Sequence, residues 1–419
     1  MQFEPAAGLP GEALAESGAA GYASHEERCC KPMQTQSDRL KALPPYLFAE
    51  IDRKKKAAIA AGRPVIHLGI GDPDTPTPDF IIKAAQAAVA DPATHPYALD
   101  RGDLGFRKAI AAWHKKRFGV TVDPETEILP AQGSKETLSH LPLALMNPGD
   151  VGLVPDPGYP VYASSIQFAG GEVVRFPITA DRNYLPDLGA FEKKDLKKAK
   201  LIYLNYPNNP TAASATLEFY EEVVAWAQEH KIVVAQDAAY SEVYFEDPPP
   251  SILQIRGAMD VAVEFYSCSK TFNMTGWRVG WVAGNAAVIE SLVEIKSNMD
   301  NGVFTAMQRA GAAALEGYDR PEIHALRAMY RRRRDCLVAA LTAAGLEVNR
   351  PQATFYVWIK CPGGLDSRTF ADRLLSEADI VATPGIGYGP HGEGYVRMAL
   401  TVPEAKLEEA AARIKKLKF

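Results

Sequence analysis

The sequence predicts an α/β protein with a large three-layer unit, in which helices cover both faces of a mostly parallel β-sheet, and a smaller α+β unit. Two observations lead to this fold class. Between residues 127 and 283, short strands that are apolar on both sides alternate with helical patterns, as in chains that wind a parallel sheet. After residue 316, three helical patterns are combined with three strands, which is typical of a separate α+β unit.

Composition places the chain among ordinary globular proteins of enzyme size. It has 419 residues, of which 47% are hydrophobic and 23% are charged. A net charge of −5 gives no indication of a nucleic-acid or anionic-membrane partner, and no apolar run approaches the roughly 20 residues that span a bilayer. The five cysteines have the spacing of neither a zinc site nor a disulfide framework. We therefore expect a protein of the reducing cytoplasm that binds no metal.

The chain is expected to divide into four segments. Residues 1–36 are predicted to be a disordered extension, because the first 32 are rich in Ala, Gly and Glu and lack the features of a secretory signal. Residues 37–77 are predicted to form an arm and part of a small domain. Residues 78–315 are predicted to form the large domain, and residues 316–419 the C-terminal small domain.

Hydrophobic periodicity predicts the elements in chain order. A basic-faced helix is expected to end near Gly62, before a short strand at 64–68. The strands expected in the large domain are 128–129, 151–154, 173–176, 201–204, 232–235, 261–266 and a last one that ends at Ala283. The helices expected there cover about 78–90, 104–118, 134–146, a stretch after Pro160, 216–230, 286–297 and 303–315.

The C-terminal unit is read from the same periodicity. Its predicted helices are 321–344, 367–377 and 403–418, and its predicted strands are 355–359, 380–382 and 394–400. Four consecutive arginines, 331–334, lie within the first of these helices. We expect them to form a solvated helix face.

Polar clusters follow several of the predicted strands, where ligands bind in open parallel sheets. One of them surrounds Lys270, which lies between two apolar strands in the stretch EFYSCSKTFNMTGWRVGWVA. Because lysine amines are usually solvated, this position has two interpretations. Lys270 is either a desolvated amine that attacks a carbonyl and forms a Schiff base, or a loop lysine on a turn between strands.

Asp237, Tyr240 and Asn209 also follow predicted strands. A carboxylate at Asp237 can stay ionised beside a cationic ring nitrogen, and Tyr240 can point at the same ligand; alternatively, Asp237 is a helix N-cap. Asn209, in the segment NNPT, offers an amide to an oxygen or belongs to an ordinary Asn-Pro turn.

Several residues are candidates for binding anions. Ser134 and Lys135 open a helix directly after a strand, an arrangement that suits a phosphate but also an ordinary serine cap. Ser267 and Arg278 could contribute a hydroxyl and a charge to the same phosphate. Arg397 lies in an apolar strand, where a buried arginine normally binds a carboxylate. Taken together, the groups suit a phosphate, a ring nitrogen, a ring oxygen and an aldehyde, which are the features of pyridoxal 5′-phosphate (PLP).

The same segments carry a family resemblance over residues 38–418. SCSKTFNMTGWRVGW, YPNNPT, QDAAYSEV, DPGYPVY and GYVRMAL resemble the motifs of the fold-type I PLP-dependent aminotransferases. LPPYLFAEI, LGIGDPDTPTP, GSKE, LNYPNNPT and NMTGWR are more similar still to the LL-diaminopimelate aminotransferases.

The resemblance implies a role for each candidate. Lys270 would bind the cofactor aldehyde and then move the proton of the 1,3-shift, and Asp237 would pair with the ring nitrogen. Asn209 and Tyr240 would bond to the ring oxygen, and Tyr159 would stack on the ring. The phosphate would be held by Ser134, Lys135, Ser267 and Arg278, and Tyr97 would reach the phosphate of a neighbouring subunit. Arg397 would bind the substrate α-carboxylate, with the Gly71 backbone nearby. A homodimer with shared sites is therefore expected.

Two positions depart from the family pattern. The usual glycine after NPT is Ala212, which would carry a strain of about 1 kcal/mol if the turn requires a positive φ. The plant-like diaminopimelate enzymes have a Glu shortly before the residue equivalent to Tyr97, and the stretch 91–97 lacks it. The substrate implied is LL-2,6-diaminopimelate with 2-oxoglutarate, in the lysine pathway and by a ping-pong mechanism through pyridoxamine phosphate. A broader aspartate, alanine or aromatic aminotransferase, a PLP-dependent lyase and a cofactor-binding regulator are the alternatives.

Overall fold

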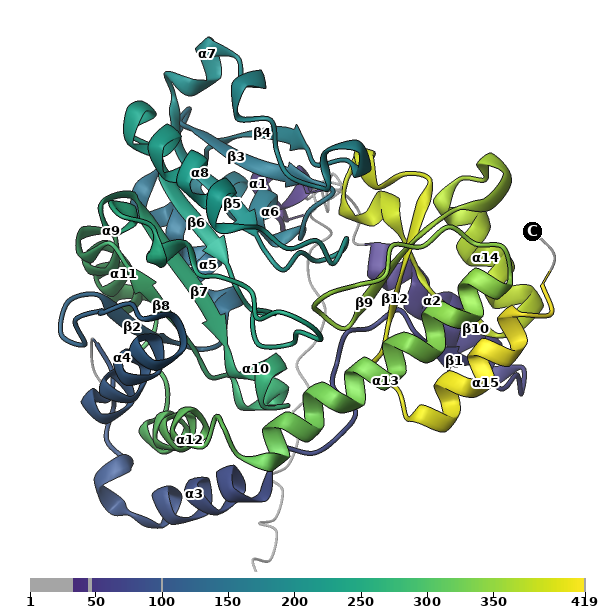
Figure 1. The fold of residues 1–419 in the computed structure, drawn as a ribbon. Coiled ribbons are helices and arrows are strands. Elements are labelled where there is room, and N and C mark those ends of the chain that lie inside the picture. The colour runs from purple at the N-terminus through teal and green to yellow at the C-terminus, as the bar shows by residue number, and fades with distance from the viewer. Residues whose placement is uncertain (1–32, 44–46, 99–100, 418–419) are drawn as a thin grey trace, which may run out of the picture.

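The computed structural model describes residues 33–43, 47–98 and 101–417. Within these ranges the chain forms a large unit around a seven-stranded sheet and a C-terminal unit around a smaller sheet, with the long helix α13 running below both (Figure 1). The predicted extension at 1–32 lies outside the described residues. No helix of the described part is long and apolar enough to cross a membrane.

The large sheet has the strand order β2-β8-β7-β6-β5-β3-β4. Strands β3 to β7 run parallel to one another, and β8, which lies between β7 and β2, is antiparallel to both. The prediction of a mostly parallel sheet is therefore confirmed. The strands are β2 Ile128–Ala131, β3 Val151–Asp156, β4 Glu172–Pro177, β5 Ala199–Asn205, β6 Val233–Asp237, β7 Ala262–Ser267 and β8 Gly280–Gly284.

Both faces of this sheet are buried, which explains why its strands are apolar on both sides. Along β5, Leu201 and Tyr203 pack with helices α5, α6 and α11, whereas Ile202 and Leu204 pack with the opposite core of α4, α8 and α12. The helices of the unit are α3 Asp79–Ala90, α4 Leu104–Phe118, α5 Ser134–Leu145, α6 Val161–Ala169, α7 Lys193–Leu196, α8 Leu217–His230, α9 Ala258–Val261, α10 Cys268–Thr271, α11 Ala286–Met299 and α12 Thr305–Glu316.

The C-terminal unit contains a three-stranded antiparallel sheet, β11-β12-β9, and a parallel pair, β1-β10. Apolar residues of α13, α14 and α15 form one core with these strands. The elements are β1 Ile66–His67, α13 Pro321–Ala343, β9 Tyr356–Lys360, α14 Ser367–Ala378, β10 Ile380–Val381, β11 Thr383–Pro384, β12 Tyr395–Ala399 and α15 Glu404–Ile414. Because β1 pairs with β10, the N-terminal segment takes part in this unit.

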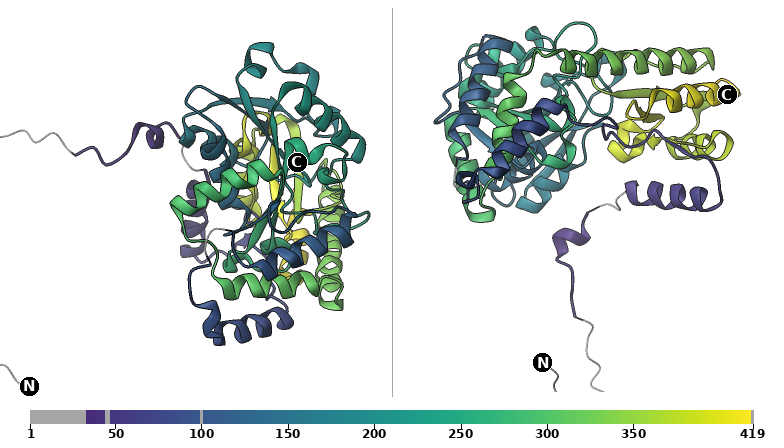
Figure 2. Two further views of the ribbon diagram at one scale, coloured as in Figure 1. Left: turned by 90° about the vertical axis from the view of Figure 1, so that its left-hand side faces the viewer. Right: turned by 90° about the horizontal axis from the view of Figure 1, so that it is seen from below.

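Within the described residues, two helices precede β1. They are α1, Asp38–Lys41, and α2, Leu47–Ala60. Figure 2 shows α2 beside the C-terminal unit, where the Lys54 ammonium contacts the Asp372 carboxylate at 2.7 Å. The N-terminal segment therefore lies against the C-terminal unit before it reaches β1.

The expectation that the four arginines at 331–334 are solvated is wrong for two of them. Arg333 and Arg334 are buried, and each binds a carboxylate from a distant part of the chain: Arg333 contacts Asp74 at 2.6 and 2.9 Å, and Arg334 contacts Glu246 at 2.8 Å. The physical reason is that α13 is covered by segments that precede it by up to 259 residues, which helical periodicity cannot reveal.

Candidate active site

A cavity of about 410 Å³ lies beyond the carboxyl ends of the central strands. It brings together every residue proposed from the sequence except Tyr97. The predicted residues that line it are Gly71, Ser134, Lys135, Tyr159, Asn209, Asp237, Tyr240, Ser267, Lys270, Arg278 and Arg397.

The register of the sheet explains why these residues meet. Asn205 at the end of β5 is paired with Asp237 at the end of β6, and β7 continues beyond the partner of Asp237 to Ser267. Successive parallel strands thus end at one edge, and the first polar residues of each loop face one space. Lys270 then lies on α10, one turn after Ser267, whose hydroxyl accepts a hydrogen bond from the Ser269 N–H at 3.2 Å.

Lys270 is a partly buried amine in this cavity. Its Nζ donates to the Gly71 carbonyl at 3.0 Å and lies 5.6 Å from the centre of the Phe355 ring. The pKa of Lys270 is lowered from 10.5 to about 8, mainly by burial. The Asp72 carboxylate opposes this shift, and the charges of Arg278 and Arg397 contribute to it. A substantial fraction of the amine is therefore neutral near physiological pH, as a nucleophile requires.

Asp237 is a buried carboxylate that lines the cavity. One oxygen accepts a hydrogen bond from the Tyr162 hydroxyl at 2.8 Å, and the other accepts one from the Ala239 N–H at 3.1 Å. Burial raises the pKa of Asp237 to about 6, although these two hydrogen bonds act in the other direction. A cationic group beside Asp237 would favour its ionised form.

Asn209 is held by the residues around it. Its N–H donates to Asn205 Oδ1 at 2.8 Å, and Asn205 Nδ2 donates to the Asp237 carbonyl at 2.8 Å, so Asn205 ties two strand ends together. In the turn after Asn209, Ala212 has a φ of 62°. This is the positive φ that the usual glycine of the family motif would adopt more easily. Ala212 therefore carries the left-handed strain of about 1 kcal/mol.

Ser134 and Arg278 line the cavity at the start of α5. Glycine is favoured at position 133, before the first turn of α5, for two reasons. Its φ is +74°, and a side chain there would meet the Arg278 guanidinium. Arg278 donates to the Gln132 carbonyl and to the Thr275 carbonyl, both at 3.0 Å. A helix N-terminus, a hydroxyl and a guanidinium thus gather where a phosphate could bind.

Arg397 is a buried cation whose hydrogen bonds go to neutral groups. Its two terminal nitrogens donate to Asn209 Oδ1 and to the Gly69 carbonyl, both at 2.7 Å, and its guanidinium lies 3.9 Å from the centre of the Tyr356 ring. Among the residues that the structure describes, no carboxylate forms an ion pair with Arg397, and its Nε has no hydrogen-bond acceptor. A buried guanidinium in this state is suited to an anionic ligand.

Tyr240 and Gly71 are both in contact with Tyr356. The hydroxyls of Tyr240 and Tyr356 lie 3.0 Å apart, and a side chain at position 71 would overlap with the Tyr356 ring. Glycine is therefore needed at position 71 for this close approach to Tyr356. The approach also places the Gly71 carbonyl at hydrogen-bond distance from the Lys270 amine.

Tyr97 lies apart from the cavity of its own chain. It is 73% exposed, and it is not among the residues that line the cavity. In the stretch before it, the Asp91 carboxylate binds Arg309 at 2.6 Å and the Ala93 N–H at 3.0 Å. The acidic residue that precedes Tyr97 in this stretch is thus already engaged.

Sequence reasoning missed three residues that complete the site, Tyr162, Asn205 and Tyr356. Tyr162 follows Tyr159 by one helical turn in DPGYPVY, so the i, i+3 spacing was an available signal. Asn205 ends a strand just before NNPT, which was a second signal. Nothing local distinguishes Tyr356 from the other apolar residues of β9.

A family model described as aminotransferase class I and II matches residues 63–414. The chain belongs to this family. An LL-diaminopimelate aminotransferase of Aquifex aeolicus is 52% identical over 384 residues, which are 91% of this chain and 99% of the relative. Another, of Nitratidesulfovibrio vulgaris, is 50% identical over 383 residues, or 91% and 98% of the two chains.

Solved aminotransferase-family structures share the fold along nearly the whole chain. Substrate-bound BacF from Bacillus subtilis is 39% identical with a TM-score of 0.88, covering 92% of this chain and 99% of its own. A mutant aspartate aminotransferase of Thermus thermophilus is 30% identical with a TM-score of 0.85, covering 92% and 100%. The predicted family and the PLP fold type I are therefore confirmed.

Aminotransferases of this family use PLP, and the cavity residues fit that cofactor. The buried Asp237 carboxylate suits a pyridinium nitrogen, and the Tyr162 hydroxyl holds it in place. Ser134 and Arg278 offer donors for a phosphate at the end of the cavity where α5 begins. The partly neutral Lys270 amine lies between these two groups and suits an aldehyde.

Proposed function

We propose that this aminotransferase moves an amino group between LL-2,6-diaminopimelate and 2-oxoglutarate. The observation that carries the proposal is the identity of about half of all residues, over nearly the full length, with relatives named LL-diaminopimelate aminotransferase. The cavity is consistent with such substrates, because Arg397 is a buried guanidinium suited to a carboxylate, and both the donor and the acceptor carry one next to the reacting carbon.

The residues of the cavity divide the work among them. When bound, PLP supplies a reactive aldehyde and a ring that withdraws electrons. Asp237 keeps the ring nitrogen protonated, Asn209 and Tyr240 donate to the ring oxygen, and Tyr159 covers the ring. Ser134, Lys135, Ser267 and Arg278 hold the phosphate.

Lys270 and Arg397 act on the substrate. Arg397 orients the α-carboxylate with the backbone at Gly71 nearby, so that the Cα hydrogen faces Lys270. Lys270 Nζ would then take the proton from Cα and release it again as an acid, while bound PLP would supply the ring that withdraws the electron pair. The pKa of Lys270, lowered to about 8 by burial, suits an amine that must act first as a base and then as an acid.

A broader specificity for aspartate, alanine or aromatic amino acids is the second candidate. It is favoured by the similarity to the Thermus thermophilus aspartate aminotransferase mutant and by the absence of the expected Glu in the stretch 91–97. The Asp91 carboxylate does not replace that Glu, because it is bound by Arg309.

A substrate comparison with the purified, PLP-loaded protein separates the two candidates. We expect the highest kcat/KM with LL-diaminopimelate and 2-oxoglutarate, and little turnover of the meso isomer. Brisk turnover of aspartate or alanine, with none of LL-diaminopimelate, would overturn the proposal in favour of the broader enzyme. A protein that takes up no PLP would exclude both.

We also propose that the active unit is a homodimer in which Tyr97 completes the phosphate site of the other subunit. Tyr97 is 73% exposed and lies outside the cavity of its own chain, as such a role requires. Sedimentation should therefore give a dimer, and Tyr97→Phe should weaken PLP binding without changing the oligomeric state. A fully active monomer would exclude the shared site.

A further inference from the structure

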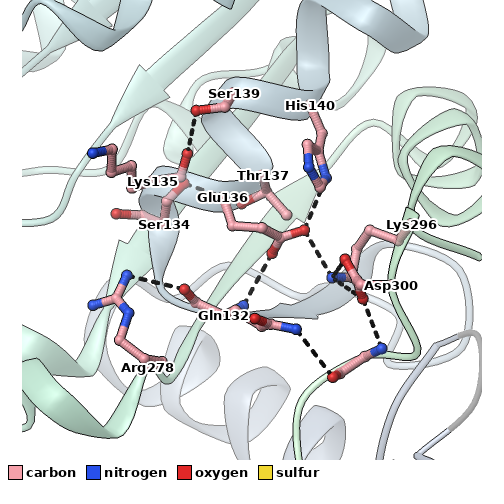
Figure 3. Close-up of polar contacts among 11 residues, drawn as sticks. Gln132, Ser134, Lys135, Glu136, Thr137, Ser139, His140, Arg278, Lys296 and Asp300 are labelled. Atoms are coloured by element: carbon pink, nitrogen blue, oxygen red, sulfur yellow. Dashed lines mark hydrogen bonds and ion pairs between the residues drawn. The ribbon is translucent and has the colours of Figure 1, made fainter. Parts of the chain in front are cut away.

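A buried ion cluster lies beside the end of the cavity where α5 begins. It consists of Glu136, His140, Lys296 and Asp300, and we call it the Lys296 cluster (Figure 3). Lys296 Nζ donates to Glu136 Oε1 at 2.8 Å and to both oxygens of Asp300 at 3.1 Å, and its side chain is only 2% exposed. His140 Nδ1 lies 2.9 Å from the same oxygen of Glu136.

The ammonium of Lys296 is the cation of this cluster. Ligand atoms of Glu136, His140 and Asp300 lie within 4.8 Å of one another, a spacing that could also hold a metal ion. Lys296 Nζ is bonded to both carboxylates of this group, so a protein cation already occupies the position between them. The cluster is thus an internal ion network rather than a vacant ligand set.

One arm of the cluster leads to the cavity through Glu136. This residue lies in the first turn of α5, and its Oε2 accepts a hydrogen bond from the Gln132 N–H at 3.0 Å. The Gln132 carbonyl in turn accepts the hydrogen bond from Arg278 at 3.0 Å (Figure 3). Lys296 is therefore connected to the Arg278 guanidinium through two intervening residues.

A second arm closes the network into a ring. Asp300 Oδ1 accepts a hydrogen bond from the Gly302 N–H at 2.7 Å, and the Gly302 carbonyl accepts one from Gln132 Nε2 at 3.2 Å. Gln132 is thus held at its N–H by Glu136 and at its side chain by the loop after α11. Its carbonyl, the acceptor for Arg278, is left little freedom to move.

We propose that the Lys296 cluster is a positioning device for the phosphate group of the cofactor. By fixing Gln132, it fixes the Arg278 guanidinium and the start of α5 in the geometry that a phosphate needs. This inference rests on the proposed function, in which Ser134 and Arg278 hold that phosphate. Glu136, Lys296 and Asp300 are positioning residues and touch no ligand.

The charge state of Glu136 agrees with this role. Burial alone would raise its pKa, but the hydrogen bond to His140 and the charge and hydrogen bond of Lys296 bring the pKa below its usual value. Glu136 is therefore ionised near neutral pH and can accept from Gln132 and Lys296 at once. Loss of its charge should loosen both contacts.

The test compares PLP with pyridoxal, which lacks the phosphate. Glu136→Gln keeps the size of the side chain but removes its charge. Titration of the PLP-free protein, followed by absorbance, should show a Kd for PLP that is raised about tenfold, the scale of one hydrogen bond to a charged group. The Kd for pyridoxal should stay within about twofold of the wild-type value, since the phosphate site is then not used.

Two further variants make the test decisive. Asp300→Asn weakens the hold on Lys296 from the other side and should produce the same selective loss, so it replaces Glu136→Gln if that variant does not fold. Glu347→Gln is the control, because it removes the carboxylate of the exposed ion pair with Lys360, at 2.9 Å, and should change neither affinity.

The outcomes separate the inference from the proposed function. An unchanged Kd for PLP in both folded variants, or an equal loss of affinity for PLP and pyridoxal, would overturn the positioning role. A wild-type protein that binds neither ligand would instead overturn the proposed function.

Discussion

Two lysines of this protein are removed from bulk water, and their surroundings are opposite. Lys270 lies in the cavity, and its amine donates to a single neutral acceptor, the Gly71 carbonyl. Lys296 lies in the Lys296 cluster, where its amine is bonded to the carboxylates of Glu136 and Asp300. The amine of Lys270 thus has no carboxylate bonded to it, whereas the amine of Lys296 has two.

The difference indicates what each lysine does. Without an anionic partner, burial lowers the pKa of Lys270 to about 8, and the amine becomes available for chemistry. With two carboxylates, Lys296 is a fixed charge that holds segments 160 residues apart in one place. Substitution of Lys270 should therefore affect mainly activity, and substitution of Lys296 mainly stability.

The largest expected effect is the loss of turnover in Lys270→Ala. Removal of the amine deletes the group that moves the proton, so kcat should fall by roughly 10⁴-fold. The variant should still bind PLP, but without the visible absorbance band of the lysine-bound cofactor. Its midpoint of urea unfolding should be equal to or above that of the wild type, since a poorly solvated amine is removed. Turnover within tenfold of wild type would contradict the role of Lys270.

The next effect is on stability, in Lys296→Met. This change leaves Glu136 and Asp300 facing each other with no cation, which should reduce the free energy of unfolding by about 3–5 kcal/mol. Urea unfolding of the PLP-free protein measures it. Lys360→Met is the matched control, because its ion pair with Glu347 is exposed and should contribute less than about 1 kcal/mol. Equal effects of the two substitutions would show that the Lys296 cluster has no special structural role.

The smallest expected effect is the pH dependence of stability that Lys270 contributes. Its pKa is lowered from 10.5 to about 8 in the folded protein, so between these values the unfolded chain binds a proton that the folded chain has lost. The stability contributed by this group therefore rises with pH across that window by about 3 kcal/mol, of which about 2 kcal/mol falls between pH 7.5 and 9.5. Unfolding of PLP-free wild type and Lys270→Met at pH 7.5, 8.5 and 9.5 measures the difference. Parallel pH profiles for the two proteins would mean that the pKa of Lys270 is not lowered.

Much of the cavity could be predicted because its residues follow strands that are easy to recognise. Asp237, Asn209 and Lys270 each come a few positions after an apolar run, and the carboxyl ends of parallel strands meet at one edge. The departure at Ala212 was visible for a related reason, since the NPT turn has a fixed shape and the structure gives Ala212 a φ of 62°. In these cases a local pattern and a general rule of topology were sufficient.

Burial and charge pairing between distant segments could not be predicted in the same way. The arginines at 331–334 have the pattern of a solvated helix face, yet Arg333 and Arg334 are buried against Asp74 and Glu246. Tyr356 carries no mark in the sequence of its contact with Tyr240. The spacing of Tyr162 from Tyr159 is visible, but it does not by itself reveal the hydrogen bond from Tyr162 to Asp237.

The sequence by itself determined the fold class, the family and nearly all of the residues that line the cavity, because these depend on periodicity and on motifs a few residues long. Only the tertiary structure decided which charges surround the two lysines, Lys270 and Lys296. Lys296 and Asp300 are spaced i, i+4 on or beside α11, the pattern of an ordinary surface ion pair. The carboxylate of Glu136 and the residues that bury Lys296 come from segments far away in the chain, and they make Lys296 a structural cation. Lys270 has no such carboxylate bonded to its amine.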